Sequence, residues 1–486
     1  MYDYLAIDIG AGSGRIIHGT FDGSILVLNE TYRFTNNMLS DNGHFRWDVK
    51  GLFAEILQGL QESAKQISAT PASIGIDTWG CDYVLLDEND NIVCPVTAYR
   101  DSRTDGLMEK FFALVSKSEI YAKTGIQFMQ FNTLYQLWAA QQNGDFENAK
   151  RFLMIPDYLN FCLTGIKANE YSNATTTQVL NSKSNDWDED LLNVLKIDKS
   201  IFQKPLLPGT VLGPLLDSIQ DETGLSAIPV IMPATHDTGS AVAAVPATGK
   251  DWAYISSGTW SLMGIETNEA VCTELALEYN FTNEGGVAGT FRLLKNIMGL
   301  WLVRGLKKSF KQDHSYEDLR SMARETKAFD IFIDANDASF LNPTCMMTAI
   351  DQYCLATGQK TPQSYGAYVR CAVESLGFLY KETLEQLRDI QDQEINKIHI
   401  IGGGCQDELL CQITADATGL PVFAGPCEGT AVGNLIVQAI ALGHIKNLAE
   451  ARKVIADSFE IKIYTANNKS DWDNAWQTFQ QIRGQK

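Results

Sequence analysis

A glycine-rich turn near the N-terminus places the strongest constraint on the fold of this chain. Residues 3–9 have the pattern of a buried strand, Gly10-Ala-Gly-Ser-Gly14 that of a turn, and Arg15–Thr20 that of a second strand. A glycine turn between two strands is a β-hairpin, whereas dinucleotide-binding and P-loop folds require a strand, a turn and a helix. Arg15 also occupies the position of the third glycine in GxGxxG, and no GxxxxGK[ST] string occurs. These features argue against a dinucleotide-dependent oxidoreductase.

A second hairpin of the same kind is predicted in the other half of the chain. Trp252–Ser256 and Trp260–Glu266 are strand-like and are joined by the turn Ser257-Gly-Thr259. The segment 246–251, Pro-Ala-Thr-Gly-Lys-Asp, has the composition of a linker. The repetition suggests two related α/β domains, residues 1–246 and residues 247–486.

The remaining pattern is that of alternating strands and helices. Further strands are predicted over 25–34, 73–77, 228–231, 397–401 and 421–424, with a strand–turn–strand over 83–94. Helices are predicted over about 48–66, 298–310, 316–326, 364–392, 406–418 and 428–442. Gly402-Gly-Gly404 is a third glycine turn, here between a strand and a helix.

Composition excludes several classes of protein. The formal charge of −20 over 486 residues argues against a general nucleic-acid-binding surface. No run of 18 apolar residues predicts a membrane span, and the N-terminus lacks the basic start of a secretory signal, so a cytoplasmic protein is expected. Ten cysteines without a CxxC pair indicate reduced thiols, although pairing of Cys354 with Cys371 stays open. The six histidines show no metal-ligand spacing, so no structural metal is expected.

The stretch from Pro233 to Val245 is the main candidate for chemistry. Asp237 lies between His236 and Thr238 at the predicted start of a helix. Such a carboxylate can cap the helix, or it can accept a proton from a bound alcohol. The local sequence alone leaves both roles open.

An ordered set of motifs carries a specific resemblance. Phosphoryl transfer requires amides and cations around the phosphates and a base at the acceptor hydroxyl. The chain resembles the FGGY carbohydrate kinases over nearly its whole length, through Asp8-Ile-Gly-Ala-Gly-Ser-Gly-Arg15, Gly75-Ile-Asp-Thr-Trp-Gly80, Thr235-His-Asp-Thr238, Ser256-Ser-Gly-Thr-Trp-Ser-Leu262, Asn296-Ile-Met-Gly-Leu-Trp301, Phe340-Leu-Asn-Pro343 and Gly402-Gly-Gly404. Each motif is modest alone, and their order makes the set specific.

The resemblance implies a fold and a nucleotide site. It implies two RNase H-like domains of the actin-like ATPase type, with sugar and ATP in the cleft between them. Asp8 would be the Mg²⁺-associated carboxylate, directly or through water. The residues expected to bind ATP are Ala11, Gly12, Ser13, Gly14, Arg15, Thr259, Gly402 and Arg304. For Arg15 the alternative is pairing with an acid in the hairpin, and for Arg304 an ordinary position on the surface of a helix.

The resemblance also implies a sugar site. Its expected residues are Gly80, His236, Asp237, Thr238 and Asn296, with Asp237 as the catalytic base. Trp79 could pack against a deoxy sugar or belong to the core, and Asp82 is expected to be a solvated loop acid.

The activity implied is ATP-dependent phosphorylation of L-rhamnulose at its C1 hydroxyl, which gives L-rhamnulose 1-phosphate. The strings Asp-Thr-Trp-Gly and Thr-His-Asp-Thr favour this sugar within the family. Kinases for other ketoses, such as fuculose or xylulose, are the nearest alternative, and an actin-like ATPase without a sugar substrate is a more distant one. No nucleic-acid or membrane partner is expected, and the protein is expected to be a monomer or a small homo-oligomer.

Overall fold

The chain is described here for residues 1–484, from a computed structural model. These residues pack into two compact units. The first contains Met1–Thr248, Glu266–Leu293 and Gly429–Ser458, and the second contains Gly249–Ile265, Leu294–Glu428 and the stretch from Phe459 onward. The chain therefore enters the first unit three times, whereas the two predicted domains are continuous, and their single boundary after residue 246 stays a prediction.

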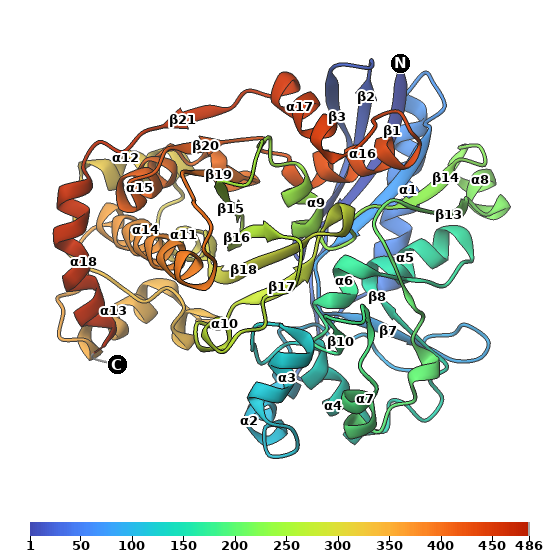
Figure 1. The fold of residues 1–486 in the computed structure, drawn as a ribbon, viewed down its shortest axis with the longest axis horizontal. Helices are drawn as coiled ribbons and strands as arrows, with labels where there is room; N and C mark the ends of the chain where they lie inside the picture. Colours follow the sequence, from blue (N-terminus) through green and yellow to red (C-terminus); the bar gives the residue numbers. More distant parts are fainter. Residues whose placement is uncertain (485–486) are drawn as a thin grey trace. The chain divides into compact units, whose positions relative to one another are not determined.

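A six-stranded mixed sheet forms the centre of the first unit. Its order is β13-β14-β6-β1-β2-β3, with bounds β1 Tyr2–Ile9, β2 Ser13–Phe21, β3 Leu26–Thr35, β6 Ser73–Thr78, β13 Thr210–Pro214 and β14 Pro229–Met232. The strands β1 and β2 pair antiparallel as the predicted hairpin, and β1 also pairs in parallel with β6 (Figure 1). The glycine turn therefore lies at the end of a central strand.

A seven-stranded sheet repeats this plan. Its order is β17-β18-β16-β15-β19-β20-β21, with bounds β15 Trp252–Ser257, β16 Trp260–Thr267, β17 Thr282–Gly285, β18 Phe291–Met298, β19 Lys397–Ile401, β20 Val422–Ala424 and β21 Lys462–Tyr464. Four strand pairs recur in both sheets. The antiparallel hairpin β15–β16 matches β1–β2, and the parallel pair β15–β19 matches β1–β6. The parallel pair β19–β20 matches β6–β14, and the antiparallel pair β20–β21 matches β14–β13. The predicted α/β class and the duplication of the fold are both confirmed.

Helices and short strand pairs surround the sheets. The helices of the first unit are α1 Val49–Gln66, α2 Leu107–Phe111, α3 Lys117–Thr124, α4 Thr133–Asn143, α5 Ile155–Thr164, α6 Tyr171–Thr175, α7 Glu189–Leu195, α8 Asp217–Thr223, α9 Asp237–Ala243, α10 Glu274–Glu278, α16 Gly429–Ala441 and α17 Leu448–Ser458. Those of the second are α11 Trp301–Ser309, α12 Tyr316–Glu325, α13 Met346–Ala356, α14 Tyr365–Ile390, α15 Glu408–Thr418 and α18 Lys469–Arg483. The short pairs are β4 Leu39–Asp41 with β5 His44–Arg46, β7 Tyr83–Leu86 with β8 Arg151–Met154, β9 Asn169–Glu170 with β12 Pro205–Leu206, and β10 Leu180–Asn181 with β11 Asp186–Trp187. No helix in residues 1–484 is long and apolar enough to cross a membrane.

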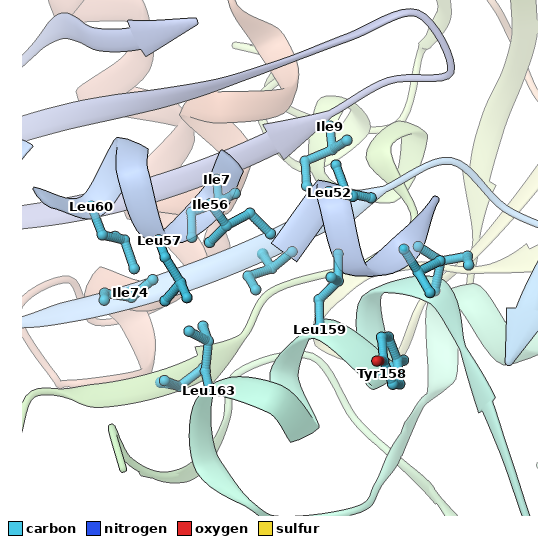
Figure 2. Close-up of a cluster of buried hydrophobic side chains, with 14 of the residues drawn as sticks. Ile7, Ile9, Leu52, Ile56, Leu57, Leu60, Ile74, Tyr158, Leu159 and Leu163 are labelled. Carbon is cyan, nitrogen blue, oxygen red and sulfur yellow. The ribbon is translucent and has the colours of Figure 1, made fainter. Parts of the chain in front are cut away.

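The core of the first unit lies between its sheet and the helices α1 and α5. Leucines and isoleucines from β1, α1, β6 and α5 meet there, with Ile7, Ile56 and Leu159 fully buried (Figure 2). Burying side chains of this size contributes about 1.5–3 kcal/mol each. This cluster holds β1 and β6 against their helices, and it therefore fixes the strand ends that carry the polar residues described below.

Two segments differ from the prediction. The return strand expected within 83–94 is reduced to a single bridge between Leu86 and Ile92, because β7 pairs with β8 instead. The helix expected from residue 298 begins at Trp301, and residues 291–298 form strand β18. Gly299 separates the two, and a Cβ atom there would lie 2.6 Å from the carbonyl carbon of Trp260. This close approach explains why the residue between the strand and the helix is a glycine.

Helix α16 covers the first sheet although it comes from the C-terminal part of the chain (Figure 1). It packs on β1, β6 and α9, and its Gly433 touches the backbone of α9. A Cβ atom at Gly433 would lie 1.7 Å from the carbonyl oxygen of Ser240, which no side chain allows. The position of α9 therefore depends on the glycine of α16.

We predict that Gly433→Ala lowers the stability of the protein by about 3 kcal/mol, because the added methyl group forces α9 and α16 apart. Thermal and denaturant unfolding measure the loss. Ala441→Ser, at the half-buried end of the same helix, is the control and leaves stability nearly unchanged. A Gly433→Ala protein as stable as the wild type would contradict the tight approach of the two helices.

Candidate functional site

Three carboxylates lie at the carboxyl ends of neighbouring strands in the first unit. Asp8 is next to last in β1 and is the register partner of Asp77 in the parallel strand β6. Asp237 follows β14, and its stretch is fixed to β6 by a hydrogen bond from the Thr78 amide to the Thr235 carbonyl at 2.8 Å. Ligand sites of open α/β sheets form at this edge. Parallel pairing thus brings together acids from three distant parts of the sequence.

Burial and neighbouring carboxylates raise the proton affinity of Asp77. Burial raises the pKa of Asp77 well above the usual aspartate value, Asp8 and Asp237 raise it further, and a hydrogen bond from Asn434 at 2.6 Å opposes the shift. Its Oδ1 atom is buried and has no hydrogen-bond partner among the described residues. An unpaired oxygen among like charges favours the presence of a cation at this edge.

Asp237 is the most accessible of the three acids. Its side chain is 32% exposed, and Thr238 holds Oδ1 through its amide at 2.5 Å and its hydroxyl at 3.1 Å. Desolvation raises the pKa of Asp237 above the usual value, His236 lowers it, and Asp8 raises it further. The second oxygen, Oδ2, accepts no hydrogen bond from residues 1–484. It is therefore free to receive a proton from an external hydroxyl.

Arg15 pairs with Asp8 across the hairpin. The two residues are register partners in β1 and β2, and Arg15 donates to Asp8 Oδ2 from Nε at 3.0 Å and from Nη2 at 2.7 Å. The alternative in which Arg15 pairs with an acid is thus present in the structure. Contact of the same guanidinium with phosphate stays a prediction.

The glycine turn before Arg15 has a solvent-exposed tip, and its end at Gly14 is buried. Gly12 and Ser13 are exposed, whereas Gly14 is buried, and a Cβ atom there would lie 2.2 Å from the ring of Phe34. The Gly10 amide closes the turn on the Ser13 carbonyl at 2.9 Å. Glycine at position 14 is thus required by packing, and glycine at position 12 leaves the amides of the tip accessible.

The imidazole of His236 contacts a buried ion pair that was not predicted from the sequence. Its Nδ1 lies 3.1 Å from Nη2 of Arg292 and 3.2 Å from Oε2 of Glu284, and those two atoms are themselves 3.1 Å apart. The other ring nitrogen, Nε2, lies 3.5 Å from Oδ1 of Asp237. A Cβ atom at Gly80 would lie 3.4 Å from the same Nε2. The one signal in the sequence was Arg292 inside the apolar run Phe291–Leu294, where a charge must be buried.

Glu170 is a second buried acid that the sequence analysis missed. Its carboxylate accepts hydrogen bonds from the amide and hydroxyl of Thr235, from the amide and hydroxyl of Ser172, and from the amide of Asn173, at 2.6–3.1 Å. Burial raises the pKa of Glu170, and these hydrogen bonds oppose that shift. Glu170 thereby fixes the segment that leads into Asp237.

Asp82 is not the solvated loop acid that was expected. It is fully buried, and it accepts hydrogen bonds from the indoles of Trp47 at 2.7 Å and Trp79 at 2.9 Å and from the Tyr99 amide at 3.1 Å. An unpaired buried carboxylate is costly, and these donors compensate. Trp79 is therefore a core residue in this structure, with its indole committed to Asp82.

The other predicted site residues belong to the second unit. Thr259 is exposed in the β15–β16 turn, Arg304 is exposed on α11, and Asn296 is half-buried on β18. Gly402 has a φ of +79°, and a Cβ atom there would lie 3.0 Å from the Ser257 carbonyl oxygen. The structure thus groups the predicted sugar residues Gly80, His236, Asp237 and Thr238 with Asp8 in one unit, and places the four residues of this paragraph in the other.

Cysteines and metal ligands form no further site in the part of the chain described. All ten cysteines are free thiols, including Cys354 and Cys371. No group of three or more His, Cys, Asp or Glu residues in 1–484 has the geometry of a metal site. A cation at the strand ends would therefore need ligands beyond the protein, as Mg²⁺ bound to phosphates and water has.

Known proteins similar to this chain are carbohydrate kinases. Residues 3–244 match the N-terminal domain of the FGGY family of carbohydrate kinases, and residues 253–442 match its C-terminal domain. A protein from Halalkalibacterium halodurans named rhamnulokinase is 47% identical over 96% of this chain and 99% of its own length. Rhamnulokinases from Oceanobacillus iheyensis and Bacteroides thetaiotaomicron are 46% and 44% identical, over 95% and 98% of this chain and 97% and 98% of their own.

Solved structures agree with this assignment at the level of the fold. A xylulose kinase from Lactobacillus acidophilus superimposes with a TM-score of 0.83 at 18% identity, over 100% of this chain and 98% of that one. A glycerol kinase from Plasmodium falciparum superimposes with a TM-score of 0.77 at 15% identity, over 98% and 97%. The predicted two-domain kinase fold is confirmed.

We predict that Glu170→Gln destabilises the first unit by about 2–3 kcal/mol, because the new amide group would face the amide N–H of Ser172 instead of accepting from it. Turnover falls as well, since Thr235 is released from its anchor. Denaturant unfolding and steady-state kinetics measure the two effects. Glu222→Gln, at an exposed position in α8, is the matched control, and equal stability of the two variants would contradict the anchoring role.

Proposed function

This chain belongs to the FGGY family of carbohydrate kinases, and on that premise we propose that it transfers the γ-phosphoryl group of ATP to the C1 hydroxyl of L-rhamnulose. One observation carries the choice of sugar: relatives named rhamnulokinase are 40–47% identical over at least 95% of this chain. The products are L-rhamnulose 1-phosphate and ADP.

Asp237 is the base of the proposed reaction. The C1 oxygen attacks the γ-phosphorus in line, the bond from that phosphorus to the β–γ bridging oxygen breaks, and ADP leaves. The hydroxyl proton goes to Oδ2 of Asp237, the oxygen without a hydrogen-bond partner in residues 1–484. The raised pKa of this carboxylate makes it a better proton acceptor, and its fixed position matters more than its strength in a loose transition state.

The nucleotide contacts are proposed for two glycine turns and their neighbours. The exposed tip of the first hairpin would present amides to the phosphates without obstruction from side chains. Thr259 would contact phosphate as well, and Gly402 and Arg304 would lie on the adenosine side. The residues assigned to ATP are Ala11, Gly12, Ser13, Gly14, Arg15, Thr259, Gly402 and Arg304.

The carboxylates at the strand ends fit a magnesium ion. Mg²⁺ is held in proteins by one or two carboxylates together with water and phosphate oxygens. Asp8, directly or through water, would hold it next to the unpaired oxygen of Asp77. The ion would supply positive charge beside the transferred phosphoryl group.

The sugar contacts are proposed for the residues around Asp237. The backbone of Gly80, the side chains of His236 and Thr238, and the amide of Asn296 would bind hydroxyl and carbonyl oxygens. An amide both donates and accepts, which suits a hydroxyl group.

A panel of ketoses and polyols, with coupled detection of ADP, tests the proposal. We expect ADP release to depend on sugar and kcat/KM to be highest for L-rhamnulose. A higher value for fuculose or xylulose would reassign the substrate within the family. Sugar-independent ATP hydrolysis would instead favour an ATPase without a small substrate and would overturn the kinase assignment.

We predict that Asp237→Asn lowers kcat by at least about 10²-fold, because the amide cannot accept the hydroxyl proton, while ATP affinity stays nearly unchanged. Steady-state kinetics and ATP titration measure both effects. Asp221→Asn, at an exposed position on α8, is the control with wild-type turnover. Near-normal turnover of Asp237→Asn would transfer the role of base to Asp77.

A further inference from the structure

The buried pair Arg292–Glu284 lies behind the imidazole of His236. Arg292 is completely buried on β18, and its Nε donates to the Gly285 carbonyl at 3.0 Å. Glu284 is 5% exposed on β17. Burying two charges costs several kcal/mol unless they are well paired, so a pair at this depth calls for a reason beyond stability.

The geometry gives Arg292 and Glu284 opposite effects on the same ring nitrogen. Nη2 of Arg292 can only donate, so its hydrogen bond to Nδ1 requires that Nδ1 carry no proton. Oε2 of Glu284 can only accept, so a hydrogen bond from Nδ1 would require a proton there. The 3.1 Å contact with Arg292 has hydrogen-bond geometry, whereas Glu284 Oε2 has no hydrogen-bond partner in the described residues. Arg292 thus determines that Nδ1 carries no proton, and Glu284 neutralises the charge of Arg292.

We propose that Arg292 is a positioning residue that holds His236 in the neutral tautomer with its proton on Nε2. Nε2 lies 3.5 Å from Oδ1 of Asp237 and 3.4 Å from the position of a Cβ atom at Gly80, next to the two residues where the proposed function puts the sugar. His236 therefore acts as a fixed hydrogen-bond donor to an oxygen of the ketose. This inference rests on the proposed function for the identity of the acceptor, but the tautomer itself does not.

The role of Glu284 follows from the same arrangement. Burial raises the pKa of Glu284, but Arg292 and His236 lower it below the usual glutamate value, so the carboxylate stays ionised beside the guanidinium. Without Arg292, Oε2 would be the polar atom nearest to Nδ1, and the proton would move from Nε2 to Nδ1. The ring would then present a lone pair to the sugar where a donor is required.

The ¹⁵N shifts of the His236 ring nitrogens test the tautomer. In the wild type we expect an unprotonated Nδ1 and a protonated Nε2, assigned by the loss of these signals in His236→Gln. In Arg292→Met we expect the reverse pattern. A wild-type ring protonated at Nδ1, or at both nitrogens, would overturn the proposal, and so would an unchanged tautomer in Arg292→Met.

Kinetics provide a second readout. Arg292→Met should lower kcat/KM for L-rhamnulose by at least about tenfold, because the hydrogen bond to the sugar is lost, while KM for ATP is unchanged. A wild-type kcat/KM would contradict the role of the donor. If no ketose supports turnover in the wild type, the proposed function fails, and the tautomer shifts still decide the positioning role of Arg292.

Two further variants separate positioning from stability. Arg292→Met combined with Glu284→Met removes both charges, so no unpaired charge remains buried to unfold the protein. In this double variant we expect ring shifts averaged between the two tautomers, and a wild-type pattern would overturn the proposal. Arg452→Met breaks another ion pair of the same unit, with Glu266 at 2.7 Å, and should keep the wild-type tautomer.

Discussion

Parallel pairing of β1 with β6 is the interaction on which the site depends. The register sets Asp8 beside Asp77, and the continuation of the sheet through β14 adds Asp237 at the same edge. Three carboxylates so close together oppose folding electrostatically, and the apolar cluster beneath them compensates. The sheet therefore brings three carboxyl groups to one edge, where Arg15 pairs with Asp8 and the pKa of Asp77 is raised. The apolar cluster stabilises the strands, and the carboxyl groups at their ends belong to the proposed site.

The parts of this fold that could be predicted from sequence are those determined locally. Glycine turns between apolar runs identify hairpins, and their repetition predicted the duplication that the two sheets share. Asp237 could be found because its neighbours in sequence are also its neighbours in space. The boundary between β18 and α11 could not, since a buried strand and a buried helix have similar composition, and the close approach of Gly299 to Trp260 exists only in the fold.

The buried polar residues that support the site could not be predicted from the sequence for a different reason. Glu170 and Glu284 are single charges without a sequence pattern, and only Arg292, inside an apolar run, signals burial. Glu170 binds Thr235, 65 residues further along the chain, and Arg292 contacts His236, 56 residues before it. Asp82 was misassigned because a carboxylate next to a loop is ordinarily solvated, whereas here two indoles and an amide enclose it. Burial of an acid depends on hydrogen-bond donors from other parts of the fold, and a single sequence does not show which donors lie near the acid.

The contact of α16 with the first sheet has a consequence for the order of events during synthesis. Gln438 donates to the Leu5 carbonyl at 3.0 Å and accepts from Ser73 at 2.7 Å, and Asn434 donates to Asp77. Until residues 429–458 have left the ribosome, the hydrogen bonds from Gln438 and Asn434 to β1 and β6 cannot form, and the backbone of α9 has no Gly433 against it. The first 248 residues are thus an unfinished unit for most of translation. The acidic edge gains its last contacts only when nearly the whole chain exists, and a chain that ends before residue 429 lacks the hydrogen bond from Asn434 to Asp77.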